Sequence, residues 1–188
     1  MSVALQSFSE QLAPTLLKRD GVGIGPLLPE DTATMFVWTN DIETMAMDIP
    51  YRPMDGVAFA NFLSTVAADP GRVLFAIRLA GVAQAIGFLL FSNISAVNRS
   101  AELGIRIGRE NDRGRGVGTA AMALALDYAW DHLNLARVQL KVMADNPRAV
   151  RAYAKAGFAI EGRHAHAAYV AGKWHDMLTM AALNPRAQ

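Results

Sequence analysis

The sequence predicts an α/β (α+β) fold, with a mixed central sheet of about six or seven strands flanked by about four helices. Apolar runs at 73–79 and 84–91 surround Ala80-Gly81 and predict a β-hairpin. From residue 101 onward, strand-like and helix-like segments alternate, which is typical of a sheet covered by helices. A chain of 188 residues suits one domain with a sizeable core. We therefore expect an N-terminal extension over 1–20 and a single domain over 21–188.

The first third of the chain predicts one weak strand, over 22–27, and two helices. The first helix is expected to begin near Pro29-Glu30-Asp31, because acids suit the positive end of a helix dipole, and to end before Asn40. Two prolines between 41 and 53 indicate a loop. The second helix is predicted over 55–68, where Asp69-Pro70-Gly71 stops it.

The second half begins with an alternating segment, 101–108, in which Leu103, Ile105 and Ile107 share one face of a predicted strand. The apolar run over 120–130 is too long for an ordinary strand and predicts a well-buried helix. Three further signals complete the order: a strand over 137–143, a helix from the Asn146-Pro147 cap to a stop at Gly157, and two final strands from 158 to 183 with a turn at Ala171-Gly172.

A glycine-rich stretch, residues 113–119, precedes the buried helix and reads Arg-Gly-Arg-Gly-Val-Gly-Thr. Glycines allow backbone N–H groups to turn toward one point, and the N-terminus of a helix adds its dipole. Arg113 and Arg115 add two cations. The stretch therefore predicts a binding site for a phosphate or pyrophosphate group, built from seven residues: Arg113, Gly114, Arg115, Gly116, Val117, Gly118 and Thr119.

Several kinds of glycine loop compete for this stretch. A Walker A loop needs Gly-Lys-Ser/Thr, and that tripeptide does not occur in the sequence. A dinucleotide loop is matched by Gly116-x-Gly118-x-x-Ala121, but the predicted strand ends several residues too early and 137–142 lacks the expected acid. A plain glycine-rich surface turn is a further alternative. The acetyl-CoA loop, Arg/Gln-x-x-Gly-x-Gly/Ala, is matched without a gap by residues 113–118.

The segments on both sides of the loop, 101–108 and 146–158, support this last match. Together with the loop they resemble the GNAT N-acetyltransferases, especially the subgroup that includes ribosomal-protein and spermidine acetyltransferases. The resemblance is strong from 100 to 183 and looser from 22 to 92. It implies a sheet that splays between its fourth and fifth strands, where the pantetheine arm lies. It also implies acetyl-CoA as co-substrate, with a small-molecule amine or a protein N-terminus as acceptor.

Acetyl transfer by direct attack of an amine on the thioester needs a proton donor for the leaving thiolate. Tyr153 is the candidate, because it lies seven residues, two helical turns, after Asn146, and relatives with Asn-x-x-Ala-x-x-x-Tyr commonly use this tyrosine. The alternative is a half-buried core tyrosine. For Asn146 we expect contact with the pantetheine arm, a helix cap, or both.

Glu102 is the candidate general base, because a glutamate at this position is implicated in some relatives, and we expect it to act through a water. Its alternative is an ion pair, for example with Arg106. The backbone N–H groups near Leu103, Gly104 and Ile105 are expected to polarise the thioester carbonyl.

Charge differs between two parts of the chain. Residues 29–55 hold six acidic residues against one basic residue, a net −5, whereas residues 99–155 hold ten basic against six acidic residues, a net +4. A basic part suits a phosphate-bearing co-substrate, and an acidic part attracts a cationic amine. Asp41, Glu43 and Asp48 fall in the predicted loop and are the candidate acceptor-binding residues. The alternatives are helix-terminal and solvated acids, and, for the whole chain, a non-catalytic CoA-binding sensor.

Composition excludes other classes. The chain has no cysteine, which removes disulfides, thiolate catalysis and cysteine metal sites. It has no run of eighteen apolar residues and no apolar signal-peptide core, so we expect a cytoplasmic protein that does not bind membranes. Its net charge is only +1, so we expect no nucleic-acid binding. We expect a monomer or homodimer. We expect no metal, because His164-x-His166 lacks a third ligand. Asp176 is expected to be structural, since it and His175 point to opposite strand faces.

Overall fold

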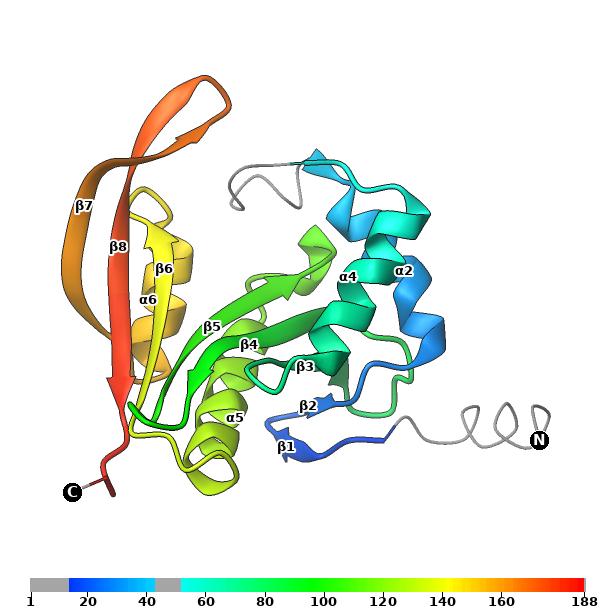
Figure 1. The fold of residues 1–188 in the computed structure, drawn as a ribbon, viewed down its shortest axis with the longest axis horizontal. Coiled ribbons are helices and arrows are strands. Elements are labelled where there is room, and N and C mark those ends of the chain that lie inside the picture. Colours follow the sequence, from blue (N-terminus) through cyan, green and yellow to red (C-terminus); the bar gives the residue numbers. More distant parts are fainter. Residues whose placement is uncertain (1–13, 43–51, 188) are drawn as a thin grey trace.

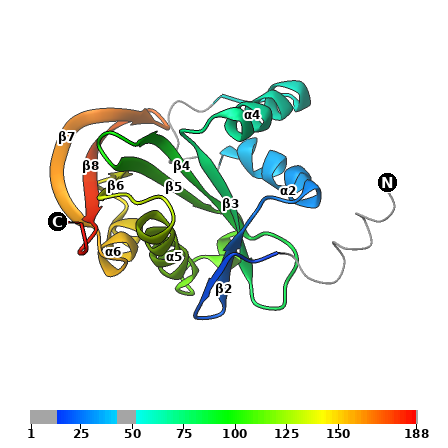
Figure 2. The ribbon, with the colours of Figure 1, turned by 60° about the horizontal axis from the view of Figure 1, so that its bottom comes forward.

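The computed structural model describes residues 14–42 and 52–187. Its centre is an eight-stranded sheet in the order β1-β2-β3-β4-β5-β6-β8-β7, in which only β5 and β6 run parallel (Figure 1). The strands are β1 Leu17–Arg19, β2 Val22–Gly25, β3 Val73–Leu79, β4 Gly87–Ser95, β5 Ser100–Ile107, β6 Arg137–Met143, β7 Ala159–Val170 and β8 Lys173–Leu183. The helices are α2 Pro29–Thr39, α4 Gly56–Ala68, the 3-10 turn η1 Glu110–Asp112, α5 Val117–Asp131 and α6 Pro147–Lys155. Helices α2 and α4 cover one face, and α5 and α6 cover the other (Figure 2).

The sheet has eight strands, whereas six or seven were predicted. The additional strand is β1, which lies inside the range predicted as an N-terminal extension. β1 pairs antiparallel with β2 through a turn at Asp20 and Gly21, both at positive φ. Arg19 also forms an ion pair with Asp127 of α5 at 2.7 Å. The sheet therefore begins before residue 21. β1 has only three residues, and Lys18 and Arg19 are two of them. A segment this short and polar does not predict a strand.

The predicted helices are confirmed, and their caps explain where they begin. Asp55 Oδ1 accepts a hydrogen bond from the Ala58 N–H at 2.7 Å at the start of α4. Asn146 Oδ1 does the same for Ala149 at 3.1 Å at the start of α6. After α6 the chain turns at Gly157, whose φ of 105° favours glycine. Asn146 and Gly157 thus set where α6 begins and ends.

The core lies mainly between the sheet and α5, which is apolar on nearly all sides as predicted. Its buried residues include four alanines, Ala120, Ala121, Ala125 and Ala129, so the helix can lie close to the strands. Tyr128 of α5 packs edge-on against Phe75 of β3, with ring centroids 4.8 Å apart. The buried residues of α5 begin at Val117, directly after the glycine loop, so the packing of this helix against the sheet also positions the loop.

The sheet opens between β5 and β6. Their parallel ladder joins Ser100–Glu102 to Arg137–Gln139 only, and beyond it the strands diverge (Figure 1). The splay was expected between the fourth and fifth strands; it lies between the fifth and sixth because β1 adds a strand at the start. β5 stays paired with β4 up to Ile107, so its other edge faces the gap.

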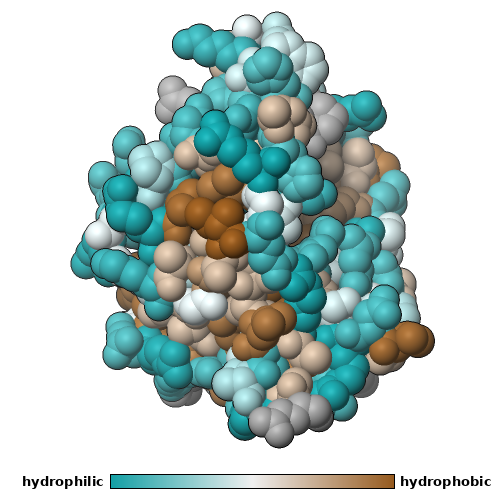
Figure 3. All heavy atoms as spheres, turned by 90° about the vertical axis from the view of Figure 1, so that its left-hand side faces the viewer, coloured by the Kyte–Doolittle hydropathy of each residue, from teal (hydrophilic) through white to brown (hydrophobic). Residues whose placement is uncertain are grey.

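The β7–β8 hairpin extends beyond the rest of the sheet (Figure 1) and turns at Ala171 and Gly172, as predicted. It exposes Tyr169 and Trp174, whose rings pack with centroids 5.2 Å apart. Seen from this side, the molecule carries an apolar patch within a mainly hydrophilic face (Figure 3). Across the described residues, every helix is too short or too polar to cross a membrane.

Candidate active site

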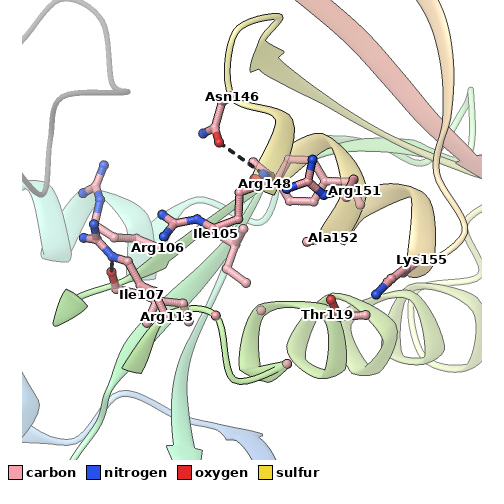
Figure 4. Close-up of a pocket in the computed structure, with 15 residues that line it drawn as sticks. Ile105, Arg106, Ile107, Arg113, Thr119, Asn146, Arg148, Arg151, Ala152 and Lys155 are labelled. Carbon is pink, nitrogen blue, oxygen red and sulfur yellow. Dashed lines mark hydrogen bonds between the residues drawn. The ribbon is translucent and has the colours of Figure 1, made fainter. Parts of the chain in front are cut away.

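A cavity of about 440 Å³ lies between the glycine loop and α6, and we call it the loop cavity (Figure 4). Gly114 and Gly116 of the loop have φ of 78° and 82°, and no atom lies within 4 Å of where a Cβ would stand at Gly114, Gly116 or Gly118. Gly116 is the N-cap of α5 and supplies no side chain to its first N–H groups. The loop therefore presents open backbone and a helix N-terminus to the cavity, as an anion site requires.

Arg113 closes the base of the loop. Its Nε donates to the Ile107 carbonyl and its Nη2 to the Gly108 carbonyl, both at 3.1 Å. The pKa of Arg106 is lowered to about 10, chiefly by burial and further by the charge of Arg113. Two guanidinium groups thus lie close enough to repel each other, and a bound anion would offset that repulsion.

Three cations of α6 also line the loop cavity: Arg148, Arg151 and Lys155. None of the three was predicted as a site residue. Their spacing of three and four residues places them on one side of the helix that begins at Pro147. This helical spacing is visible in the sequence and could have indicated a shared basic face. In Figure 4 the Lys155 ammonium points toward Thr119 at the start of α5. The loop cavity is therefore more basic than the loop alone predicts.

A second cavity, also of about 440 Å³, lies on the other side of the gap, and we call it the methionine cavity. Four methionines line it: Met35, Met54, Met143 and Met177. Phe62, Phe88 and Leu90 add apolar surface, and Arg106 and Lys141 add positive charge. Its described lining contains no Asp or Glu. Flexible thioether side chains suit an apolar ligand whose shape they can follow.

The two cavities meet at four residues that line both: Ile105, Arg106, Asn146 and Tyr153. Tyr153 is half-buried, and burial raises its pKa above the ordinary value of 10. The cap occupies Asn146 Oδ1, so its amide NH₂ group is left to bind a ligand. The gap between β5 and β6 thus joins an anion-binding cavity to an apolar one, with a protonated phenol at the junction.

Residues 22–159 match the family of acetyltransferase (GNAT) domains. This chain belongs to the GNAT acetyltransferase family. Membership confirms the predicted fold, the predicted class of enzyme, an N-acetyltransferase, and acetyl-CoA as the co-substrate of that class.

Named relatives agree. The chain is 29% identical over 161 residues to the spermidine N(1)-acetyltransferase of Escherichia coli (strain K12), covering 85% of this chain and 84% of the relative. It is 34% identical over 101 residues to the Vibrio cholerae spermidine N(1)-acetyltransferase, covering 54% of this chain and 58% of the relative. It is 34% identical over 92 residues to the putative ribosomal N-acetyltransferase YdaF of Bacillus subtilis (strain 168), covering 49% and 50%.

Among solved structures, the chain resembles spermidine N-acetyltransferase from Vibrio cholerae in complex with CoA and spermine. The TM-score is 0.81 at 25% identity, covering 88% of this chain and 96% of that one. A dodecameric structure of the Vibrio cholerae enzyme matches with a TM-score of 0.74, covering 88% and 95%.

Most of the residues predicted for the GNAT co-substrate line the loop cavity: Ile105, Arg113, Gly114, Gly116, Gly118, Thr119 and Asn146. Leu103 and Gly104 line the methionine cavity instead. Two predicted residues line neither. Val117 is buried in the core because it starts α5 on the side that packs against the sheet, and Arg115 is exposed. Their backbone still forms part of the loop, but their side chains do not reach the cavity.

Glu102, the predicted base, also lines neither cavity. It lies at the closed end of the gap, where β5 and β6 still pair. Its two carboxylate oxygens accept hydrogen bonds from Asn93 Nδ2 and Gln139 Nε2, each at 3.2 Å. Glu102 can therefore act only through intervening water, and its oxygens already have donors.

Fewer acids of residues 29–55 are available to bind a cationic amine than the number of acidic residues predicts. Asp31 is buried in an ion pair with Arg78, and Asp55 caps α4. Both carboxylates have structural partners, and neither residue lines either of the two cavities. Asp41 is half-buried and lies outside the lining of both cavities. Glu43 and Asp48 lie outside the described residues, so their part in acceptor binding stays a prediction.

His164 and His166 of β7 both contribute to hydrogen bonds within the last hairpin, His164 through its side chain and His166 through its backbone N–H. His164 Nε2 lies 2.9 Å from Thr179 Oγ1. Asp176 accepts the His166 N–H at 2.9 Å and Arg163 Nε at 2.7 Å, and these two donors, the backbone one first, lower its pKa. The predicted structural role of Asp176 fits this geometry. Over residues 14–42 and 52–187, His, Asp and Glu form no group of three that could hold a metal ion.

Proposed function

We propose that this chain transfers the acetyl group of acetyl-CoA to a primary amine by direct attack of the amine on the thioester. The observation that carries the proposal is the meeting of two unlike cavities at Tyr153 and Asn146. The loop cavity suits the phosphates of acetyl-CoA, because open backbone, the α5 N-terminus and the α6 cations converge on it. The methionine cavity is then the place for the acceptor.

The chemistry follows from the gap between β5 and β6. The pantetheine arm lies along the free edge of β5, where Asn146 offers its amide. Backbone N–H groups near Leu103, Gly104 and Ile105 polarise the thioester carbonyl as charge develops on its oxygen. The amine nitrogen bonds to the carbonyl carbon, the carbon–sulfur bond breaks, and Tyr153 donates its proton to the thiolate. Burial raises the pKa of Tyr153, which keeps this proton in place near neutral pH.

The acceptor we propose is a small amine with an apolar stretch and a second positive charge, such as a polyamine. The relatives named as spermidine acetyltransferases support this class. The methionine side chains suit the methylene groups of such a molecule. Its distal ammonium needs a carboxylate, and Glu43 and Asp48 are the candidates. The protein N-terminus remains the alternative acceptor.

The test is thiol release from acetyl-CoA with a panel of spermidine, phenethylamine and a short peptide with a free N-terminus. We expect wild-type turnover with spermidine above the other two, and roughly 10- to 10³-fold less in Tyr153→Phe. Normal CoA binding without turnover of any amine would instead favour the non-catalytic CoA-binding module.

A further inference from the structure

A histidine–aspartate pair lies beside the methionine cavity and has no part in the chemistry above. His175 of β8 and Asp145, in the turn between β6 and α6, are joined through Nδ1 and Oδ2 at 2.7 Å. The histidine side chain is 18% exposed and the aspartate side chain 62%. The two residues are 30 positions apart in the sequence, so no local pattern predicts the pair.

Neither His175 nor Asp145 is in the lining of the methionine cavity, but each is close in the chain to residues that are. Met177 follows His175 by two positions within β8, so both side chains share one strand face, and Met177 lines the methionine cavity. Asn146 follows Asp145 and lines both cavities. The Ala144 N–H donates to the Asp176 carbonyl at 2.9 Å, which holds the two segments together.

The hydrogen bond gives the imidazole a defined chemistry. A carboxylate at Nδ1 favours the neutral tautomer with its proton on Nδ1, which leaves a lone pair on Nε2. Within the described chain, Nε2 has no hydrogen-bond partner. An imidazole held this way can accept a proton at Nε2 while Asp145 stabilises the cation that results.

The reaction needs such a group. A primary alkylamine is mainly protonated near neutral pH and must lose a proton before it can attack a carbonyl. The described lining of the methionine cavity holds no carboxylate or imidazole, and Glu102 lies at the closed end of the gap with both oxygens already accepting hydrogen bonds.

We propose that His175 is the general base for the acceptor, positioned by Asp145; this rests on the proposed function. The Nε2 atom takes one proton from the ammonium group, directly or through a water. The neutral amine then forms the new C–N bond, and the C–S bond breaks as Tyr153 protonates the sulfur. The resulting tyrosinate takes the second proton from the amide nitrogen, and His175 returns its proton to solvent.

The test compares acceptors that need a base with matched acceptors that do not. Spermidine and phenethylamine are each paired with a β,β-difluoro analogue, whose amine next to the fluorines is far less basic and largely neutral at the assay pH. We expect His175→Gln to lower kcat/KM for the parent amines by roughly 10²- to 10⁴-fold and for the fluorinated amines only slightly. Asp145→Asn should give a smaller loss with the same selectivity, and His164→Gln should leave both unchanged.

A structural role for the pair predicts another result. Equal losses with parent and fluorinated amines, or no loss in His175→Gln, would overturn the proposal. So would a selective loss in Glu102→Gln without one in His175→Gln. The wild type is measured first: if it acetylates no amine, the proposed function fails, and this proposal falls with it. CoA binding and Tm, measured in each variant, separate misfolding from loss of the base.

Discussion

Arg78 and Asp31 form an ion pair whose side chains are only 3% and 1% exposed. Arg78 also donates to the Ala83 carbonyl at 2.8 Å and to the Pro26 carbonyl at 3.1 Å. Asp31 Oδ1 accepts the Ala85 N–H at 3.2 Å. The pair therefore ties the start of α2 to β3 and to the turn after it, on the face of the sheet that carries the methionine cavity.

Removing the buried carboxylate should destabilise the protein strongly. Asp31→Asn leaves the Arg78 charge buried without its counterion, and we expect a loss of about 3–5 kcal/mol in the free energy of unfolding. Urea denaturation measures it. Glu30→Gln is the matched control, because Glu30 is the exposed neighbour on the same helical turn, and it should change stability by no more than about 0.5 kcal/mol. Equal stability of the two variants would show that the ion pair makes no net contribution to the free energy of unfolding.

Gly116→Glu should abolish the rise in Tm that acetyl-CoA gives the wild type, because it places bulk and negative charge at the anion site. Gly172→Glu is the matched control. Gly172 also has a positive φ, at 80°, and open space around its Cβ position, but it lies at the tip of the β7–β8 hairpin. Both variants share the backbone strain, so their difference in CoA binding reports on the loop alone. A normal Tm shift in folded Gly116→Glu would show that the loop does not bind CoA.

The cations of α6 should add to CoA affinity through its phosphates. Neutralising Arg148 or Lys155 to Gln should weaken CoA binding about 10-fold, which corresponds to about 1.4 kcal/mol. Isothermal titration at low salt measures the loss, with Lys18→Gln on the exposed strand β1 as control. Comparing CoA with dephospho-CoA shows which cation contacts the terminal phosphate. Neutralising that cation should weaken the binding of CoA but not the binding of dephospho-CoA. Unchanged affinity in both variants would remove α6 from the site.

Tyr153→Phe should lower kcat by roughly 10- to 10³-fold and change CoA affinity little, since one hydroxyl is removed. The pKa of the phenol is raised, so it stays protonated as pH rises through the ordinary tyrosine range. Wild-type kcat should therefore not fall between about pH 7 and pH 9 through loss of this proton. An unchanged kcat in the variant, with chemistry limiting turnover, would leave Tyr153 as a core residue packed near Phe158.

The predicted acceptor acids have their own test in the salt dependence of the reaction. If Asp41, Glu43 and Asp48 attract a cationic acceptor, kcat/KM for spermidine should fall as ionic strength rises. The triple variant Asp41→Asn/Glu43→Gln/Asp48→Asn should start lower and respond less to salt. A flat response in the wild type would show that these acids are solvated surface.

Local chemistry explains which parts of the fold the sequence could predict. The caps at Asp55 and Asn146 and the stop at Gly157 are encoded within a few residues, and each helix end follows from them. β1 could not be predicted, because its pairing with β2 and its ion pair to Asp127 are contacts made only in the folded chain.

The same distinction applies to the site. The glycine loop and Tyr153 were recognisable because their spacing is contiguous or helical. The Arg78–Asp31 and His175–Asp145 pairs join residues 47 and 30 positions apart, so only the sheet brings them together. Arg148, Arg151 and Lys155 lie between these cases, since their helical spacing was visible but the cavity that they line was not.

The most direct test of the central claim is mass spectrometry of the acceptor after incubation with isotopically labelled acetyl-CoA. We expect that a primary amine, with spermidine foremost, gains one labelled acetyl group for each CoA thiol released, and that Tyr153→Phe slows both together. Thiol release without an acetylated amine, or CoA binding with no transfer to any amine, would contradict it.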